Sequence, residues 1–328
     1  MKNIFALLSL LYIITCCSQE KEATKTPVEA ASQNIFIADP SIFYNNGTYY
    51  LYGTTTGNIA NGDGFLVYTS SDLQKWSGPN GVQNGLALKK GDAYGDKGFW
   101  APQILEYNKK FYMIYTANEN IAIASSDSPL GPFKNEHKKP IFETGNQIDP
   151  FIFIDEDGKK YLYHVRLTNG NRIFVAELND DLQSIKPETL TECISGTLPW
   201  ENTQNVEWQV TEGPTVLKRD GLYYMIYSAN DFRNPDYAVG YATSQTPYGP
   251  WEKSNDSPII STKNTGQNGV GHGDVFWGKN DKMHYVLHMH FSKTEVSPRK
   301  AGIMNLNFKD KKITVESKNL EPLKVVNP

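Results

Sequence analysis

An internal repeat constrains the fold of this chain more than any other feature. From Asn34 onward, five segments share one layout: a special residue, an apolar stretch, a turn and a stretch of alternating aromatic residues. The segments read DPSIFYNNGTYYLYGT, APQILEYNKKFYMIYTA, DPFIFIDEDGKKYLYHV, EGPTVLKRDGLYYMIYSA and GDVFWGKNDKMHYVLHM. They recur roughly every 60 residues, a period that indicates stacked or radially repeated structural units.

Each repeat contains signals for four strands. The turns Asn46-Gly47, Asp157-Gly158 and Asp220-Gly221 predict tight hairpins inside the first halves of three repeats. Second halves such as FLVYTSSDLQKW and YAVGYATSQTPYGPW add two more short strands. We therefore predict an all-β fold, a five-bladed β-propeller with four antiparallel strands per blade, over residues 34–328. A two-sheet sandwich is the alternative, but it does not account for five copies of one motif.

The N-terminal residues predict export and lipid attachment. Lys2 precedes an apolar run from Ile4 to Ile14, too short to span a bilayer and typical of a secretory signal. Residues 1–17 resemble a bacterial lipoprotein signal with Cys17 as the lipidated residue; Cys16, or an ordinary cleaved signal, is the alternative. Residues 18–33 are polar and predict a flexible tether. We expect a cell-envelope protein, at the outer-membrane surface or periplasmic face, that contacts the membrane through the anchor only.

Charge and composition exclude several classes of function. The 32 basic and 36 acidic residues are well mixed and leave a formal net charge of −4, so nucleic acid is not an expected partner. No Gly-rich phosphate loop, Ser-His-Asp ordering or CxxC pair is present. Aromatic residues make up 12% of the chain, which suits a β-rich core and also a surface on which sugars stack.

Three carboxylates stand at or beside the starts of repeats. Asp39 and Asp149 precede prolines at the same repeat position, and Glu212 lies two residues before Pro214. The innermost strand of each propeller blade lines the central axis, so these acids are expected to converge. A single Asp-Pro pair is a common way to enter a strand. Recurrence at equivalent positions favours a catalytic interpretation, and paired carboxylates are the groups that hydrolyse glycosidic bonds.

The order of the segments ADPSIF, WAPQI, DPFIF, TEGPTV and GHGDVF resembles glycoside hydrolase family 43 over essentially everything from Asn34 onward. This family contains five-bladed inverting enzymes that act on arabinose- and xylose-containing polysaccharides. The resemblance implies that Asp39 is the general base and Glu212 the general acid. Asp149 would be a third acid that keeps the pKa of Glu212 raised and holds its orientation.

The resemblance extends to residues around the acids. It implies that Trp100 stacks against sugar, with a packed core indole as the alternative. It places His272 on the axis, where it coordinates Ca²⁺ through water in some members; a structural histidine is the alternative. Arg299 matches, less closely, an arginine that binds sugar or the acids. No cofactor is required, and a structural Ca²⁺ on the axis is the one metal to be considered.

Three further histidines alternate along one predicted strand, at positions 284, 288 and 290. Alternation places them on one face, which invites a zinc site. The repeat aligns His288 with Tyr115, His164 and Tyr227, so we expect pocket-lining or core positions instead.

The resemblance predicts an exo-acting, inverting glycoside hydrolase that releases terminal α-L-arabinofuranose or β-D-xylose from plant cell-wall polysaccharides or oligosaccharides. Family β-xylosidases often carry an additional C-terminal β-sandwich, and the present sequence ends at Pro328, which slightly favours arabinofuranose. An endo-arabinanase with an open groove and a non-catalytic carbohydrate-binding propeller are the alternatives. The sugar and its linkage remain open at this stage.

Overall fold

The computed structural model describes residues 32–56, 62–142, 145–316 and 320–326. The predicted signal peptide, Cys17 and most of the tether lie outside the described residues. Strand β1 (Ser32–Asn34) includes the last two residues of the expected tether. No helix among the described residues is both long enough and apolar enough to cross a membrane.

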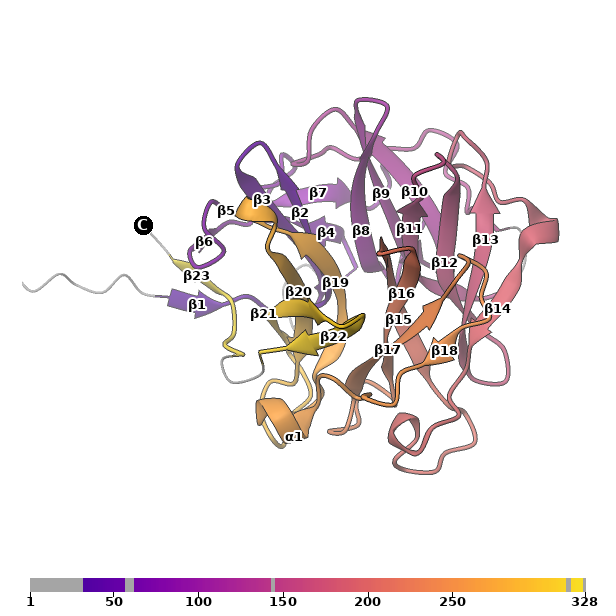
Figure 1. Cartoon of the computed structure of the whole chain (residues 1–328). Helices are drawn as coiled ribbons and strands as arrows, with labels where there is room; N and C mark the ends of the chain where they lie inside the picture. Colours follow the sequence, from indigo (N-terminus) through magenta and orange to yellow (C-terminus); the bar gives the residue numbers. More distant parts are fainter. Residues whose placement is uncertain (1–31, 57–61, 143–144, 317–319, 327–328) are drawn as a thin grey trace, which may run out of the picture.

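Five sheets surround one axis and correspond to the five repeats (Figure 1). From the axis outward, blade 1 contains β2 (Ile37–Asn45), β3 (Thr48–Thr55), β5 (Tyr68–Ser70), β6 (Trp76–Ser77), β23 (Lys324–Val326) and β1. Blade 2 contains β8 (Trp100–Tyr107), β9 (Lys110–Ala117) and β10 (Asn120–Ser126). Blade 3 contains β11 (Gln147–Ile154), β12 (Lys160–Leu167), β13 (Asn171–Leu178) and β14 (Thr191–Ile194).

Blades 4 and 5 each have four strands. Blade 4 contains β15 (Thr211–Arg219), β16 (Leu222–Ala229), β17 (Ala238–Ser244) and β18 (Glu252–Lys253). Blade 5 contains β19 (Gly271–Trp277), β20 (Met283–Met289), β21 (Lys300–Lys309) and β22 (Lys312–Val315). The predicted five-bladed propeller is confirmed. In blade 2 a bridge between Ser125 and Lys134 stands in the place of a fourth strand.

The remaining elements are short. Strands β4 (Gly64–Leu66) and β7 (Leu86–Lys89) form a separate two-stranded sheet that packs against blades 1 and 2. The helical turns are α1 (Thr262–Thr265), η1 (Pro187–Thr189), η2 (Pro199–Glu201) and η3 (Lys279–Asp281).

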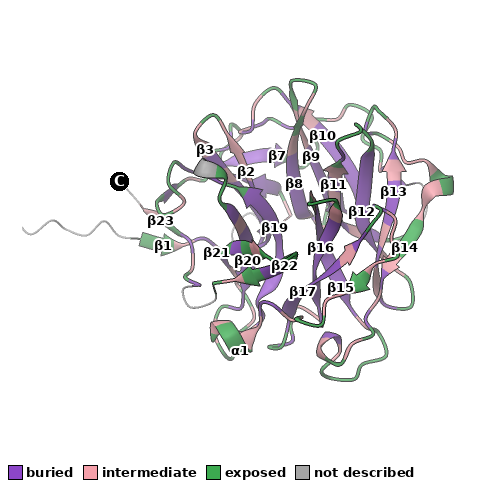
Figure 2. Ribbon diagram, in the orientation of Figure 1, coloured by how far each residue is buried: buried purple, intermediate pink, exposed green. Residues whose placement is uncertain are grey.

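The tyrosine-rich second strands form much of the core. Tyr52, Tyr115, Tyr163, Tyr224 and Tyr227 are all fully buried. Their rings fill the space between neighbouring blades, where the inner strands are buried and the connecting loops exposed (Figure 2). These aromatic residues therefore serve the core, where each buries a large apolar area.

The two ends of the described chain close the ring. β1 pairs antiparallel with β23, and β23 pairs with β6 of blade 1. The backbone N–H of Ile35 donates to Leu323 O at 2.9 Å, and its carbonyl accepts from Ala301 N of blade 5 at 3.3 Å. These bonds join the first blade to the last.

A β-bulge interrupts every innermost strand near the axis. The bulged residues Asp39, Ala101, Asp149, Gly213 and His272 have φ angles of 47°, 45°, 55°, 57° and 39°. Positive φ is uncommon outside glycine and is concentrated at functional sites, where surrounding structure holds it. A bulge also changes the direction of a side chain relative to the sheet. Each repeat thus has a bulge at its start. The site residues on the innermost strands stand at the bulge position or directly before it.

The contacts that join the first blade to the last are predicted to contribute strongly to the free energy of unfolding. Ile35→Ala should lower the free energy of unfolding by about 2–5 kcal/mol, because Ile35 is buried between the first and last blades. Ile154→Ala is the control: this side chain is 37% exposed, and its loss should cost less than about 1 kcal/mol. Urea unfolding measures both. Equal destabilisation by the two variants would show that the contacts between the first and last blades contribute no more to stability than a partly exposed side chain does.

Candidate active site

The six predicted site residues all line one cavity of about 400 Å³ at the start of the innermost strands. They are Asp39, Trp100, Asp149, Glu212, His272 and Arg299. The remaining wall comes from loops beside blades 3 and 4 and includes Asn171, Trp208 and Phe232. A volume of this size is typical of small-ligand sites.

Asp39 is surrounded by hydrogen-bond donors and positive charge. Its Oδ1 lies 3.2 Å from Arg299 Nη1, 3.3 Å from His272 Nδ1 and 3.3 Å from His288 Nδ1. Thr54 Oγ1 donates to Oδ2 at 2.6 Å. Burial opposes ionisation of this carboxyl, but Arg299 and the two histidines outweigh it and hold the pKa of Asp39 well below its usual range. Asp39 is therefore an ionised, buried carboxylate.

Arg299 and Asp39 both lie beside the buried His288 ring. Arg299 Nη1 lies 3.4 Å from His288 Nε2. His288 Nδ1 accepts the backbone N–H of Asp39 at 3.2 Å and lies 3.3 Å from Asp39 Oδ1. The guanidinium also lies over the Phe232 ring, 4.4 Å from its centroid. The weakest sequence match, Arg299, is thus in direct contact with the predicted base.

His288 was missed as a site residue because the repeat alignment was displaced by one position. In the strand register, His288 pairs with Gly271, the residue directly before the bulge of blade 5. Thr54, Thr116 and Ser228 pair with the residues directly before the bulges of blades 1, 2 and 4. The alignment with tyrosines was therefore wrong. The side chains at this position bond the bulge N–H of the next blade, at 2.8–3.2 Å in four blades.

Blade 3 is the exception to this pattern. Its residue at the same register is Val165, opposite Ile148, and valine has no hydroxyl to accept the next bulge N–H. The N–H of Gly213 instead donates to Asp149 Oδ2 at 3.3 Å. Because Val165 cannot accept a hydrogen bond, the Gly213 N–H is available to Asp149.

Glu212 has the opposite environment from Asp39. Tyr237 OH donates to Oε1 at 2.8 Å and Asn171 Nδ2 to Oε2 at 3.0 Å, while no cation contacts the carboxyl among the described residues. Burial raises the pKa of Glu212 to about 7, and the negative charge of Asp39 adds to this. Trp208 Nε1 donates to Asn171 Oδ1 at 2.9 Å and so orients the amide that holds Glu212.

Asp149 shares the electrostatic environment of Glu212. Burial, followed by the charges of Glu212 and Asp39, raises the pKa of Asp149 well above its usual range, against the opposing Gly213 N–H. His272 Nδ1 lies 3.7 Å from Asp149 Oδ2. Two neighbouring carboxyls with raised pKa values hold protons that a solvated pair would lose. For Glu212 itself, burial rather than Asp149 is the largest cause of the raised pKa.

Tyr237, Asn171 and Thr54 were also missed as site residues. Thr54 ends the first half of the first repeat and Tyr237 begins the second half of the fourth, where the repeat predicts strands without marking site residues. One signal for Tyr237 was present in the glycine before His272. A Cβ on Gly271 would lie 2.5 Å from the Tyr237 ring, so only glycine permits this packing. Asn171 reaches Glu212 because the segment before β15 runs beside the start of β13.

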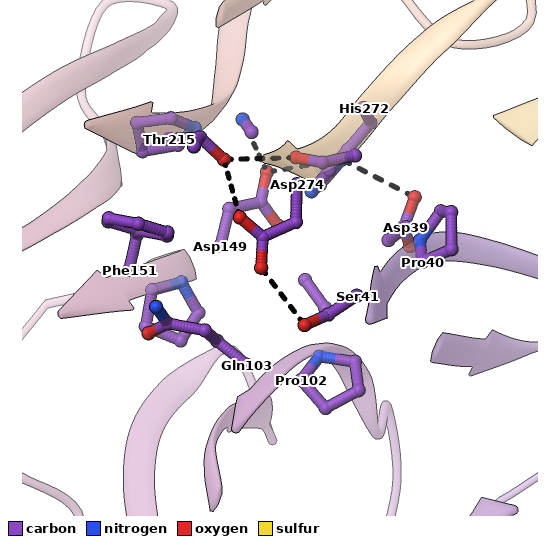
Figure 3. A pocket seen from close by; sticks show the side chains of 15 residues that line it. Asp39, Pro40, Ser41, Pro102, Gln103, Asp149, Phe151, Thr215, His272 and Asp274 are labelled. Carbon is purple, nitrogen blue, oxygen red and sulfur yellow. Dashed lines mark hydrogen bonds and ion pairs between the residues drawn. The ribbon is translucent and has the colours of Figure 1, made fainter. Parts of the chain in front are cut away.

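A smaller cavity of about 30 Å³ lies on the axis beneath the acids (Figure 3). Asp274 points into it and accepts from Ser41 Oγ at 3.0 Å and Thr215 Oγ1 at 3.2 Å. Burial raises the pKa of Asp274 to about 7. This volume accommodates only water or a single ion.

Two places in the site contain groups that could contact a metal ion: the cluster of Asp149, Glu212 and His272, and the axial cavity. Ligand atoms of Asp149, Glu212 and His272 lie within 4.8 Å of one another, but both oxygens of Glu212 already accept hydrogen bonds. These residues fit proton sharing better than metal binding. The carboxyls of Asp39, Asp149 and Asp274 line the axial cavity, whereas Ca²⁺ takes six to eight oxygen ligands. An ion there would take most of its ligands as water.

Comparisons with known proteins agree with this geometry. The chain is similar to a crystal structure described as an endo-1,4-beta-xylanase from Bacteroides thetaiotaomicron VPI-5482, with 42% identity, a TM-score of 0.83 and coverage of 91% of this chain and 100% of that one. It is 25% identical to a beta-D-galactofuranosidase, xynD, of Aspergillus niger, over 82% of this chain and 79% of that protein.

A third relative is a xylosidase/arabinosidase of Butyrivibrio fibrisolvens, 28% identical over 77% of this chain. The chain spans about half, 49%, of that protein's length. The profile of the family described as glycosyl hydrolases family 43 matches residues 32–313, which includes the innermost strand of every blade and the six predicted site residues. The chain belongs to glycoside hydrolase family 43.

Proposed function

We propose that this glycoside hydrolase is an inverting, exo-acting enzyme that releases terminal α-L-arabinofuranose or β-D-xylose from plant cell-wall polysaccharides or oligosaccharides. The observation that carries the proposal is the pairing of an ionised carboxylate, Asp39, with a protonated carboxyl, Glu212, in one buried cavity. The xylosidase/arabinosidase of Butyrivibrio fibrisolvens supports the choice of sugar.

In the proposed reaction, Asp39 accepts a proton from a water molecule as its oxygen attacks the anomeric carbon. The glycosidic C–O bond breaks, and Glu212 gives its proton to the leaving oxygen. The new C–O bond forms on the opposite face of the sugar, so the configuration inverts. Arg299, His272 and His288 keep Asp39 ionised and aimed, while the cavity excludes bulk water.

Asp149 and Trp100 have supporting roles in this proposal. A negative charge on Asp149 would disfavour ionisation of Glu212 and so favour its protonated form. Trp100, half-buried in the cavity wall, offers an aromatic face to the sugar. A structural Ca²⁺ on the axis would lie near Asp274 and would supply positive charge beneath the acids.

Two alternatives remain for comparison. Endo-action, as in the endo-1,4-beta-xylanase of Bacteroides thetaiotaomicron or in an endo-arabinanase, would use the same acids on an internal bond. A non-catalytic sugar-binding propeller has no use for a carboxyl whose pKa is raised to about 7. Hydrolysis of nitrophenyl arabinofuranoside, nitrophenyl xyloside and debranched arabinan, followed by product sizing, separates them. Single pentoses as the first product support exo-action, and mixed oligosaccharides overturn it.

The acid and base roles predict different responses to the leaving group. Asp39→Ala and Glu212→Ala should each lower kcat by about 10²–10⁴-fold on nitrophenyl glycosides. With a dinitrophenyl leaving group, which needs little protonation, Glu212→Ala should recover much of its rate. Asp39→Ala should not, since water still needs a base. Recovery by Asp39→Ala alone would reverse the two assignments.

The two carboxyls also predict the pH profile of kcat/KM. The basic limb should fall near pH 7, because Glu212 must be protonated and its pKa is raised to about 7. The acidic limb should lie below the ordinary pKa of an aspartate, because Asp39 must be ionised and its pKa is lowered. The dinitrophenyl substrate should lose the basic limb. A basic limb that is unchanged with this substrate would remove Glu212 from the role of acid.

The localisation is proposed separately, from the N-terminal sequence alone. Cys17→Ser should move the full-length protein from the membrane fraction to the soluble fraction, because the thiol that carries the lipid is lost. Cys16→Ser is the matched control and should stay in the membrane fraction. Membrane retention by Cys17→Ser together with release of Cys16→Ser would assign the anchor to Cys16.

A further inference from the structure

A second hollow of about 520 Å³ opens beside the active-site cavity. It lies between segments 201–210 and 230–234, and we call it the side hollow. Trp208, Val210, Asp231 and Arg233 line both spaces, so the two adjoin. We propose that the side hollow binds the sugar units on the leaving-group side of the scissile bond. This inference rests on the function proposed above.

The position of the general acid places the leaving group there. Glu212 protonates the leaving oxygen, so the departing part of the substrate must extend past Glu212 and away from Asp39. Trp208, a wall of both spaces, bonds the same Asn171 amide that holds Glu212. Asp231, another shared wall residue, is close enough for its charge to raise the pKa of Glu212. The side hollow therefore begins where the leaving group leaves the cavity.

The lining of the side hollow suits carbohydrate. Trp208 is 50% exposed, although an indole of this size is normally buried, and it offers a face for stacking against a sugar ring. Gln204 and Asn202 contribute amides, and the Arg233 side chain is 70% exposed. An aromatic surface with a few placed polar groups is the usual composition of a site for a polar organic ligand.

Hydrogen bonds between the two segments hold the side hollow in shape. Asn230 Oδ1 accepts from Thr203 N at 2.9 Å, and its Nδ2 donates to Trp200 O at 2.8 Å. Asn234 Nδ2 donates to Thr203 Oγ1 at 3.0 Å. Glu201, fully buried, is held by Lys253 at 2.7 Å. A site that is already ordered loses less entropy when it binds a ligand.

Two side chains retain unused donors. Arg233 bonds Asp231 through Nε and one Nη, which leaves the other Nη without a partner among the described residues. No hydrogen bond to the Gln204 amide is present in the described part of the chain. Both face solvent beside Trp208, where hydroxyl groups of a second and third sugar unit would lie. Trp208 also positions Asn171, so its removal would disturb Glu212 as well and could not test binding alone.

The test compares substrates whose leaving group carries sugar hydroxyls with substrates whose leaving group is an aryl ring without them. For Gln204→Ala and Arg233→Ala, kcat/KM is measured on arabinotriose and xylotriose and on the corresponding nitrophenyl glycosides. We expect the ratio of trisaccharide to aryl-glycoside kcat/KM to fall about 3–10-fold for Gln204→Ala, which loses neutral hydrogen bonds, and at least about 10-fold for Arg233→Ala, which loses a charged donor. Gln74→Ala, at an exposed position between β5 and β6, and Arg219→Ala, at the far end of β15, are matched controls that should keep the wild-type ratio.

The outcomes separate the two proposals. If the wild-type enzyme hydrolyses neither trisaccharides nor aryl glycosides, the proposed function fails, and the side-hollow assignment fails with it. If it hydrolyses both and the four variants share one ratio, the proposed function stands and the side hollow is not a sugar site. Equal losses on both substrates for Arg233→Ala and Gln204→Ala would place their effect in the active-site cavity and overturn the assignment.

Discussion

The bulge at the start of each innermost strand is the constraint on which the rest of the site depends. Positive φ at five equivalent positions brings side chains from five blades to one axis, although they are far apart in sequence. Non-glycine residues pay about 1–3 kcal/mol for this conformation, so neighbouring blades must hold them in place. At Gly213 the need is steric, because a Cβ would lie 2.7 Å from the His272 ring.

The fold then gives chemically similar carboxyls different proton affinities. Asp39 and Asp149 occupy the same position in their blades, yet Arg299 and two histidines lie within 3.3 Å of the Asp39 carboxylate. The Asp149 carboxylate instead accepts from the Gly213 N–H at 3.3 Å, and His272 lies farther from it, at 3.7 Å. The pKa of Asp39 is lowered and that of Asp149 raised. A carboxyl with a lowered pKa and one with a raised pKa can therefore coexist in one buried cavity, because neighbouring blades supply different partners at equivalent positions.

The repeat made much of this predictable. Its period, hairpin turns and proline positions predicted the five blades, and equivalent repeat positions predicted that Asp39, Asp149 and Glu212 converge. Other residues were missed for identifiable reasons. His288 was displaced by one position in the repeat alignment, and one residue of register moves a side chain to the opposite face of its strand. Asn171 begins β13 and Tyr237 directly precedes β17. The repeat predicted these third strands but did not mark their first residues as part of the site.

The sequence by itself determined the number of blades, the order of the strands and which acids face the axis, because periodicity and turn chemistry are local properties of the chain. Only the tertiary structure decided which carboxyl is ionised, because Arg299 and Asp39 meet from opposite ends of the sequence. It also decided that Trp208 and Arg233 border both the active-site cavity and the side hollow. Such contacts depend on how loops from adjacent blades pack together, and spacing along the chain carries no record of that packing.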